Sequence, residues 1–223
     1  MEHFYDKLLN IAPDKPILIG RDKNFKSSVL VPFVNIDGIE YLLLEKRALD
    51  IRQGGEICFP GGMIDLNDKT PEDAALRETA EELGIPEDKI QIDNHFGYLV
   101  ANMGATLDVF IGKIKIESFS QLNPNKKEVE KIYPVPFSFF VKTKPDFYSL
   151  ETETKSVCYN ESGEEKVLFP AKELGLPEKY HLSWPIKKTI VYVYNYEEII
   201  IWGLTAAIIQ EVTKFLEKGV KSE

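Results

Sequence analysis

The feature that most constrains the fold is a short acidic helix closely bounded by proline and glycine. Residues 61–85 read GGMIDLNDKTPEDAALRETAEELGI. Pro71 suits the first turn of a helix and Gly84 suits a left-handed C-terminal cap, so the sequence predicts a helix over 71–83. One side of this helix is fit for burial against another element, and it consists of Ala75, Leu76, Thr79 and Leu83.

Three carboxylates crowd an adjacent side of this helix. Glu78, Glu81 and Glu82 are three or four residues apart, so they share a face. Like charges at this spacing destabilise a helix by about a few tenths of a kcal/mol per pair. A divalent cation would relieve the repulsion, and Mg²⁺ prefers carboxylate oxygens while keeping waters that leave room for a substrate phosphate. The alternative is a solvated acidic face with Arg77 as a surface charge, because glutamate-rich helices are common.

Strands and helices are mixed along the chain. Apolar runs on either side of the Asp37-Gly38 turn signal predict a β-hairpin. The segment 142–184 reads as polar and irregular, with hairpin pieces around 160–163. The other expected elements are strands at 29–34, 40–44, 57–59, 109–116 and 199–202 and helices at about 2–12 and 204–217. This mixture predicts a single α/β domain over residues 1–223.

Composition narrows the range of partners. The net charge of −9 argues against a protein held on nucleic acid by phosphate contacts, although a small polyphosphate can still bind through a bridging cation. No apolar run approaches the roughly 20 residues of a membrane span, and the N-terminal stretch does not read as a signal peptide. Cys58 and Cys158 are too few for a disulfide framework or a zinc site. A cytoplasmic setting without membrane or nucleic-acid partners is expected.

The glycine pair and the helix sequence AALRETAEELGI together resemble the signature of the Nudix hydrolases. The matched positions are Gly62, Arg77, Glu78, Glu81, Glu82, Gly84 and Ile85. The resemblance implies a Nudix-type α/β/α sandwich with a mixed sheet between helices. It also implies hydrolysis of a nucleoside diphosphate linked to another moiety, with Mg²⁺ or Mn²⁺ bound by the three glutamates.

The resemblance also implies how the site residues divide the chemistry. Glu78 and Glu82 would hold the metal with Glu81 close by, and the metal would lower the pKa of a bound water. Either Glu81 or a downstream acid such as Glu128 would position or deprotonate that water. Arg77 is expected to orient the glutamates through charge-assisted hydrogen bonds.

The chain departs from the family signature in the loop before the helix. Lys69 stands where the family has a glutamate, and the loop leading to it is one residue longer than the common form. Asp65 or Asp68 is a candidate substitute. Because the early glutamate of the family supports loop geometry more than it binds metal, the chemistry is expected to survive.

A second motif, LLLEKRALDIRQGGEICFPGG, resembles the one that precedes the signature in coenzyme A pyrophosphatases. Its matched positions are Leu43, Leu44, Arg47, Ala48, Arg52, Gly55, Phe59, Pro60, Gly61 and Gly62. Glu45 stands where a threonine is common, and the gap between Arg52 and Gly55 is one residue shorter. Arg47 and Arg52 are expected to bind substrate phosphates, since a guanidinium pairs bidentately with phosphate, and a surface-loop charge is the alternative for both. Gly61 and Gly62 are further candidates for substrate binding.

The second resemblance implies hydrolysis of coenzyme A or its derivatives at the diphosphate, giving 3′,5′-ADP and 4′-phosphopantetheine or its acylated form. One rival is a Nudix pyrophosphatase that acts on ADP-ribose, NADH or dinucleoside polyphosphates. The other is a Nudix domain that binds nucleotide without catalysis. A small nucleotide is the expected partner, and a homodimer is left open. His95 and His181 have no nearby partner in the sequence, so a structural role is expected for both.

Overall fold

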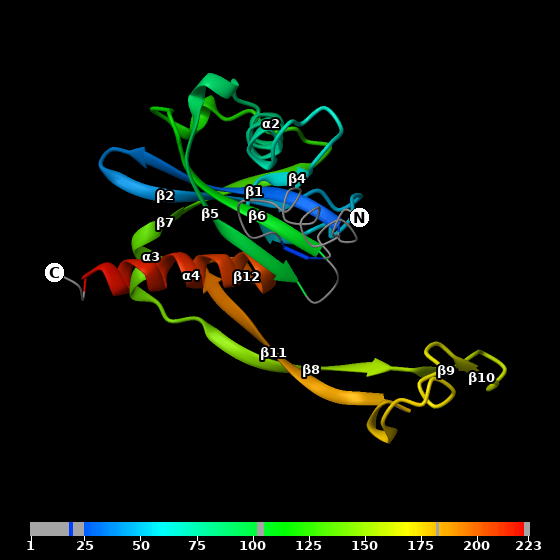
Figure 1. Cartoon of the computed structure of the whole chain (residues 1–223). Coiled ribbons are helices and arrows are strands. Elements are labelled where there is room, and N and C mark those ends of the chain that lie inside the picture. The colour runs from blue at the N-terminus through cyan, green and yellow to red at the C-terminus, as the bar shows by residue number, and fades with distance from the viewer. Residues whose placement is uncertain (1–17, 20–24, 102–104, 182, 221–223) are drawn as a thin grey trace, which may run out of the picture. The chain divides into compact units, whose positions relative to one another are not determined.

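The computed structural model describes residues 18–19, 25–101, 105–181 and 183–220 (Figure 1). The chain falls into two compact units, residues 1–138 and 139–223. The N-terminal helix that the sequence predicts at about 2–12 lies outside the described residues. The single domain over 1–223 stays a prediction.

The first unit is built on a mixed sheet that has seven strands within the described residues. They are β1 (Phe25–Ile36), β2 (Ile39–Arg47), β3 (Ile57–Cys58), β4 (Gly61–Met63), β5 (Ile90–Ala101), β6 (Ala105–Ile114) and β7 (Val129–Pro136). β1 runs parallel to β6 and antiparallel to β2 and β4. This mixed sheet, with helix α2 packed against it, confirms the α/β fold.

The predicted hairpin joins β1 to β2. Asp37 and Gly38 adopt φ values of 53° and 82°, as a two-residue turn with positive φ at both central positions requires. The Asn35 side chain accepts a hydrogen bond from the Gly38 N–H and closes the turn. The local sequence signal therefore predicted this element correctly.

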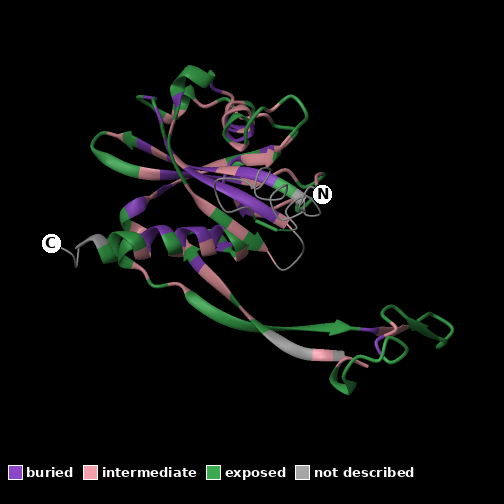
Figure 2. Cartoon of the chain, in the orientation of Figure 1, coloured by how far each residue is buried: buried purple, intermediate pink, exposed green. Residues whose placement is uncertain are grey.

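Helix α2 (Pro71–Leu83) packs against the sheet through its apolar side. Thr70 and Asp73 form a reciprocal capping box at its start, and Gly84 ends it with φ 63°. Ala75 and Leu83 of the helix join one core with residues of β1, β2, β5 and β6, among them Leu30, Leu43, Ile90 and Phe110. Buried residues therefore concentrate in the central strands (Figure 2). The predicted bounds of this helix, 71–83, are confirmed.

The second unit contains a three-stranded antiparallel sheet and a long helix. Its elements are β8 (Asp146–Lys155), β9 (Val157–Tyr159), β10 (Glu165–Val167), β11 (Ser183–Tyr196), β12 (Ile199–Trp202) and α4 (Gly203–Val220), and α3 (Phe137–Lys142) spans the boundary between the units. α4 packs on β11 and β12. No helix among the described residues is both long and apolar enough to cross a membrane.

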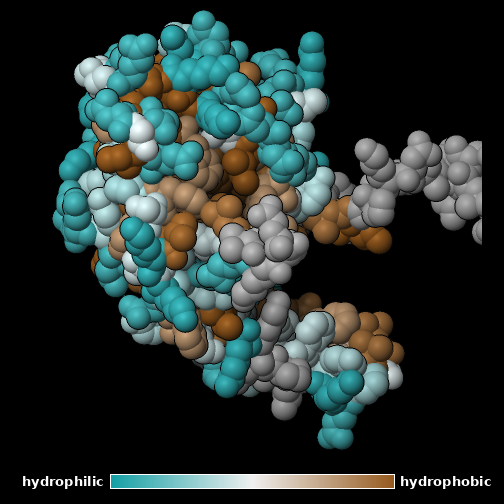
Figure 3. Space-filling model, turned by 90° about the vertical axis from the view of Figure 1, so that its left-hand side faces the viewer, coloured by the Kyte–Doolittle hydropathy of each residue, from teal (hydrophilic) through white to brown (hydrophobic). Residues whose placement is uncertain are grey.

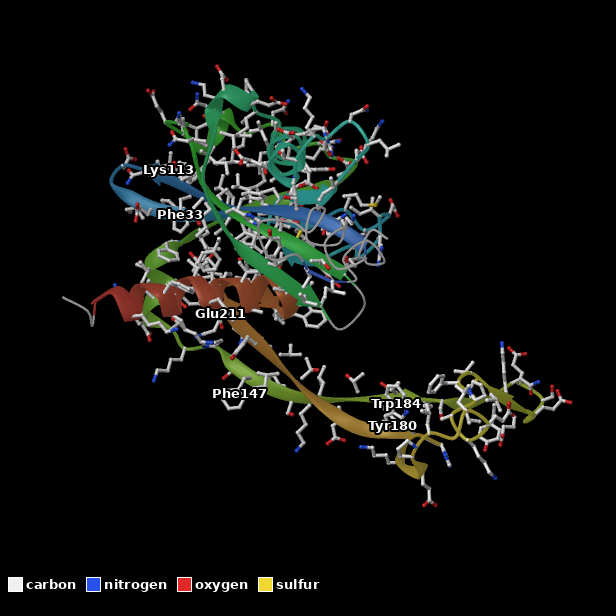
Figure 4. All side chains as sticks on the ribbon, in the orientation of Figure 1. Phe33, Lys113, Phe147, Tyr180, Trp184 and Glu211 are labelled. Atoms are coloured by element: carbon white, nitrogen blue, oxygen red, sulfur yellow. The ribbon has the colours of Figure 1, made fainter. Side chains whose placement is uncertain are left out.

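The expectation of an irregular segment over 142–184 is wrong for β8. This strand pairs with β11 over most of its length to form a ribbon. Every residue of β8 is exposed, so the strand has no buried face that would impose an apolar-polar alternation on its sequence (Figure 2). Near the end of the ribbon where Lys155 pairs with Ser183, the rings of Tyr180 and Trp184 meet edge to face, with centroids 5.6 Å apart (Figure 4).

Candidate active site

The three signature glutamates of α2 lie in different environments. The Glu82 residue is 4% exposed, whereas the side chains of Glu78 and Glu81 are 19% and 55% exposed. Figure 3 shows hydrophilic side chains gathered at the top of the molecule, the end at which Figure 1 places α2. The helix therefore buries Glu82, leaves Glu78 partly exposed and places Glu81 at the surface.

The glycine pair of β4 lies directly against the carboxylates of Glu78 and Glu82. The Gly61 N–H donates to Oε2 of Glu82 at 2.8 Å. A Cβ atom at Gly62 would fall on the carboxylate of Glu78. The backbone of β4 thus supports both glutamates. A side chain at Gly62 would displace Glu78, and one at Gly61 would collide with Ser28 and Val29 of β1.

Arg77 ties the helix to the loop that precedes it. Its guanidinium donates to both carboxylate oxygens of Asp68, at 3.1 and 2.9 Å, and to Oε1 of Glu78 at 2.9 Å. It also reaches the Met63 carbonyl at 3.3 Å. The two hydrogen bonds from Arg77 to Asp68 lower the pKa of the Asp68 carboxyl group. Asp68 therefore anchors the loop in a chain that has Lys69 in place of the usual glutamate.

A second group of charged side chains lies on β2, on the side of the sheet that α2 covers. Glu45 is fully buried, its Oε1 accepts from the Cys58 thiol at 3.5 Å, and its Oε2 has no hydrogen-bond partner. A guanidinium nitrogen of Arg47 lies 4.0 Å from Oε1 of Glu45 and 3.9 Å from Oε1 of Glu82. The Arg47 Nε also donates to the Arg52 carbonyl at 3.2 Å. The structure thus brings Arg47 to the glutamates and leaves Arg52 exposed in the β2–β3 loop.

Comparison with known proteins identifies the family. The family model described as NUDIX domain matches residues 24–183, which is more than half of the chain. The chain belongs to the Nudix family.

Three relatives place this Nudix chain among named hydrolases. Nudix hydrolase 3 of Caenorhabditis elegans is 34% identical over 146 residues, covering 63% of this chain and 60% of that protein. The peroxisomal coenzyme A diphosphatase of Mus musculus is 33% identical over 132 residues, covering 59% of this chain and 54% of that protein. The mitochondrial coenzyme A diphosphatase of Mus musculus is 28% identical over 201 residues, covering 89% and 81%. The match spans less than two thirds of the first two relatives.

Solved structures of the family include a Nudix hydrolase from M. smegmatis named RenU. It is 22% identical to this chain with a TM-score of 0.42, and the match covers 52% of this chain and 73% of that one. A MutT/nudix family protein from Enterococcus faecalis is 12% identical with a TM-score of 0.46, covering 98% and 68%. By family, the present chain is a Nudix hydrolase.

Burial, with a smaller contribution from neighbouring carboxylates, raises the pKa values of three glutamates at this Nudix site. Burial raises the pKa of Glu82, and the charge of Glu45 raises it further. Burial likewise raises the pKa of Glu45 and of Glu78, and the charge of Glu128 adds to both shifts. Glu128 is half-buried and accepts from the Asn125 side chain at 2.7 Å. The site therefore holds more negative charge than its arginines neutralise, so it favours a bound proton or cation.

The chemistry of the donors fits a divalent ion of the Mg²⁺ or Mn²⁺ type. Carboxylate oxygens are the ligands that these ions prefer, and the Glu45 Oε2 is a buried carboxylate oxygen without a hydrogen-bond partner. Across the described part of the chain, no three acidic, histidine or cysteine side chains converge in a metal-binding arrangement. Arg77 and the Gly61 N–H engage Glu78 and Glu82 separately, so a shared ion requires the glutamate side chains to rotate toward each other.

Glu45 lies in the site, although the sequence marked it only as a departure from a motif. A signal was available in the strand sequence YLLLEKR, where an acidic residue directly follows a run of leucines. Because side chains alternate along a strand, Glu45 shares a face with Leu43 and Arg47. A charge in a buried strand, in phase with a core leucine, is typical of a functional position.

Proposed function

We propose that this Nudix hydrolase cleaves the diphosphate of coenzyme A or its derivatives, giving 3′,5′-ADP and 4′-phosphopantetheine or its acylated form. The observation that carries the proposal is the position of Arg47, 3.9 Å from Glu82, on a strand that bears the motif resembling coenzyme A pyrophosphatases. A guanidinium there can pair with phosphate oxygens while the diphosphate lies at the glutamates. Two relatives named coenzyme A diphosphatases support the same substrate.

In the proposed reaction, the oxygen of a water attacks phosphorus and the P–O bond that links the two phosphates breaks. When bound, Mg²⁺ or Mn²⁺ neutralises the diphosphate and acidifies water. Glu78 and Glu82 would hold the ion, with Arg77 and the Gly61 N–H fixing their carboxylates. Because these contacts hold the two carboxylates separately, binding a shared ion requires both side chains to reorient.

The proton of the attacking water needs an acceptor. Glu81 is a candidate because its carboxylate remains at the surface, 3.6 Å from Arg77. Glu128 is the other, because its charge acts on Glu78 and it approaches the site from a separate loop. In Glu81→Gln and Glu128→Gln, the variant that loses turnover while keeping its affinity for Mn²⁺ identifies the acceptor, and an unchanged rate removes that residue from the step.

A substrate panel tests the proposed function directly. The protein is incubated with Mg²⁺ or Mn²⁺ and with coenzyme A, ADP-ribose, NADH or diadenosine tetraphosphate, and products are separated by chromatography. We expect coenzyme A to yield 3′,5′-ADP with the highest kcat/KM. Turnover of ADP-ribose without product from coenzyme A would remove the substrate assignment, and nucleotide binding without any product would favour the non-catalytic alternative.

A further inference from the structure

We propose that the β5–β6 edge of the sheet carries a stacking site for the adenine of the substrate, formed by Tyr98 and His95. The proposal deepens the proposed function and rests on it, because coenzyme A carries an adenine beyond its diphosphate. The sequence predicts only a structural role for His95. The contacts around this histidine point to more than packing.

His95 is held in place from three directions. Its Nε2 lies 3.2 Å from Oδ1 of the fully buried Asp108. Its ring stacks on Phe110 with centroids 4.6 Å apart and planes inclined by 21°, and it meets Tyr98 edge to face at 4.8 Å. A half-exposed side chain fixed this firmly is pre-organised, so binding a ligand would cost it little conformational entropy.

Two aromatic rings remain open to solvent at this place. Tyr98 is 56% exposed and the His95 side chain is 35% exposed, although both lie on the sheet face that α2 covers nearer the centre. Among the described residues, β5 is the last strand of the sheet path, so its outer edge has no neighbouring strand. An exposed tyrosine ring beside a rigid imidazole offers a flat platform, and bases stack on such platforms.

The platform lies in line with the signature glutamates. Tyr98 pairs with Asp108, Asp108 with Ser28, and Ser28 with Gly62, so these four residues form one row across β5, β6, β1 and β4. Directly opposed residues share a face, and Glu78 lies on that face over Gly62. Adjacent strands are about 4.8 Å apart, which places Tyr98 roughly 14 Å from Gly62 along the row. The ribose and phosphates of an extended nucleotide can bridge this separation.

The buried carboxylate also determines which base fits. Asp108 electrostatically favours a proton on Nε2 of His95, so Nδ1 of the neutral ring is left as a hydrogen-bond acceptor. The exocyclic amine of adenine can donate to such an acceptor, whereas hypoxanthine bears a carbonyl at that position and could donate only from its ring N1–H. A phosphate group is the poorer occupant, because Asp108 repels it. The geometry therefore favours an amino-purine.

Equilibrium binding tests this inference without relying on catalysis. The wild-type protein and four variants are titrated with AMP, IMP and ribose 5-phosphate in the presence of Mg²⁺. We expect the wild type to bind AMP at least about fivefold more tightly than ribose 5-phosphate, as stacking on one aromatic side chain predicts. Tyr98→Ala should lose this preference, and Tyr98→Phe should keep it. Tyr148→Ala is the matched control, because Tyr148 is 58% exposed on β8 and should leave the preference intact.

The outcomes separate this inference from the proposed function. An AMP preference that survives Tyr98→Ala, or that is absent in the wild type, would overturn the stacking site. If His95 accepts a hydrogen bond from adenine, the wild type should prefer AMP to IMP and His95→Ala should abolish that preference. Equal affinity of the wild type for AMP and IMP would overturn this role of His95. If coenzyme A is not hydrolysed and yet Tyr98→Ala removes the AMP preference, the stacking site stands and only the substrate assignment falls.

Discussion

At the scale of single residues, Glu82 is the most deeply buried of the three signature glutamates. It is enclosed by β4, by Arg47 and by a second buried glutamate on β2. Removing a carboxylate from such a place has opposite effects on activity and on stability. The charge is what a divalent ion would bind, whereas its burial costs folding free energy.

Glu82→Gln should therefore lower kcat/KM by at least about 100-fold, since the amide cannot neutralise a divalent ion. The melting temperature of the metal-free protein should stay level or rise, because the amide oxygen can still accept from the Gly61 N–H. Steady-state kinetics and calorimetry measure the two effects. Glu211→Gln, at an exposed glutamate of α4, is the control that should change neither. A near-normal rate in Glu82→Gln would remove this residue from the metal site.

The raised pKa values of Glu45 and Glu82 predict how stability depends on pH. Above the ordinary glutamate pKa of 4.5, the unfolded chain has released protons that the folded site still holds. The folded state binds more protons, so the free energy of unfolding of the metal-free protein should fall as the pH rises from about 5 to about 8. Denaturant titrations at both values test this, and a rise in stability would contradict the raised pKa values. Mn²⁺ should restore stability most at the higher pH.

Gly62 links the backbone of β4 to the chemistry. In Gly62→Ala the new methyl group would displace the Glu78 carboxylate, which is the movable end of a flexible side chain. We expect kcat/KM to fall by about 100-fold, as a displacement of about 1 Å can cause, with little change in stability. Gly97→Ala is the matched control within the same sheet, because no atom lies within 4 Å of its added Cβ. Equal rates in the two variants would show that Glu78 need not lie over Gly62.

At the scale of elements, the sequence correctly predicted those elements whose ends are set by residues next to them in the chain. The bounds of α2 follow from Pro71 and Gly84, and the β1–β2 hairpin follows from Asp37-Gly38. β8 was missed because both of its faces are exposed. The capping role of Asp73 was not predicted either, although Thr70 followed by an acid three residues later is a capping-box pattern.

Gly84→Ala tests how strongly the end of α2 depends on its glycine. An alanine there meets both a left-handed backbone and the carbonyl of Asn123. Gly38→Ala is the control, because it has a similar positive φ with no atom near the added Cβ. Both variants should lose about 1 kcal/mol from the backbone conformation, and Gly84→Ala should lose more because of the collision. Equal losses in urea unfolding would show that the Asn123 loop moves aside freely.

At the scale of the whole molecule, the sequence could not predict which distant segments meet. The signature identified Glu78, Glu81 and Glu82 because they share one helix. Glu45 joins them only through the pairing of β2 within the sheet, and Asp108 comes into line with Gly62 only through the parallel pairing of β1 with β6. Such contacts depend on tertiary register, which no local pattern specifies.

The length of β1 has a practical consequence for measuring this protein. Ser28, near one end of the strand, belongs to the row that runs to the glutamates, whereas Asp37 and Gly38 form an exposed turn beyond the other end. Asp37 follows Ser28 by nine positions of extended chain, or roughly 30 Å. A fluorophore or an immobilisation tag inserted at this turn would therefore lie far from the proposed nucleotide site, on a connection that tolerates added length.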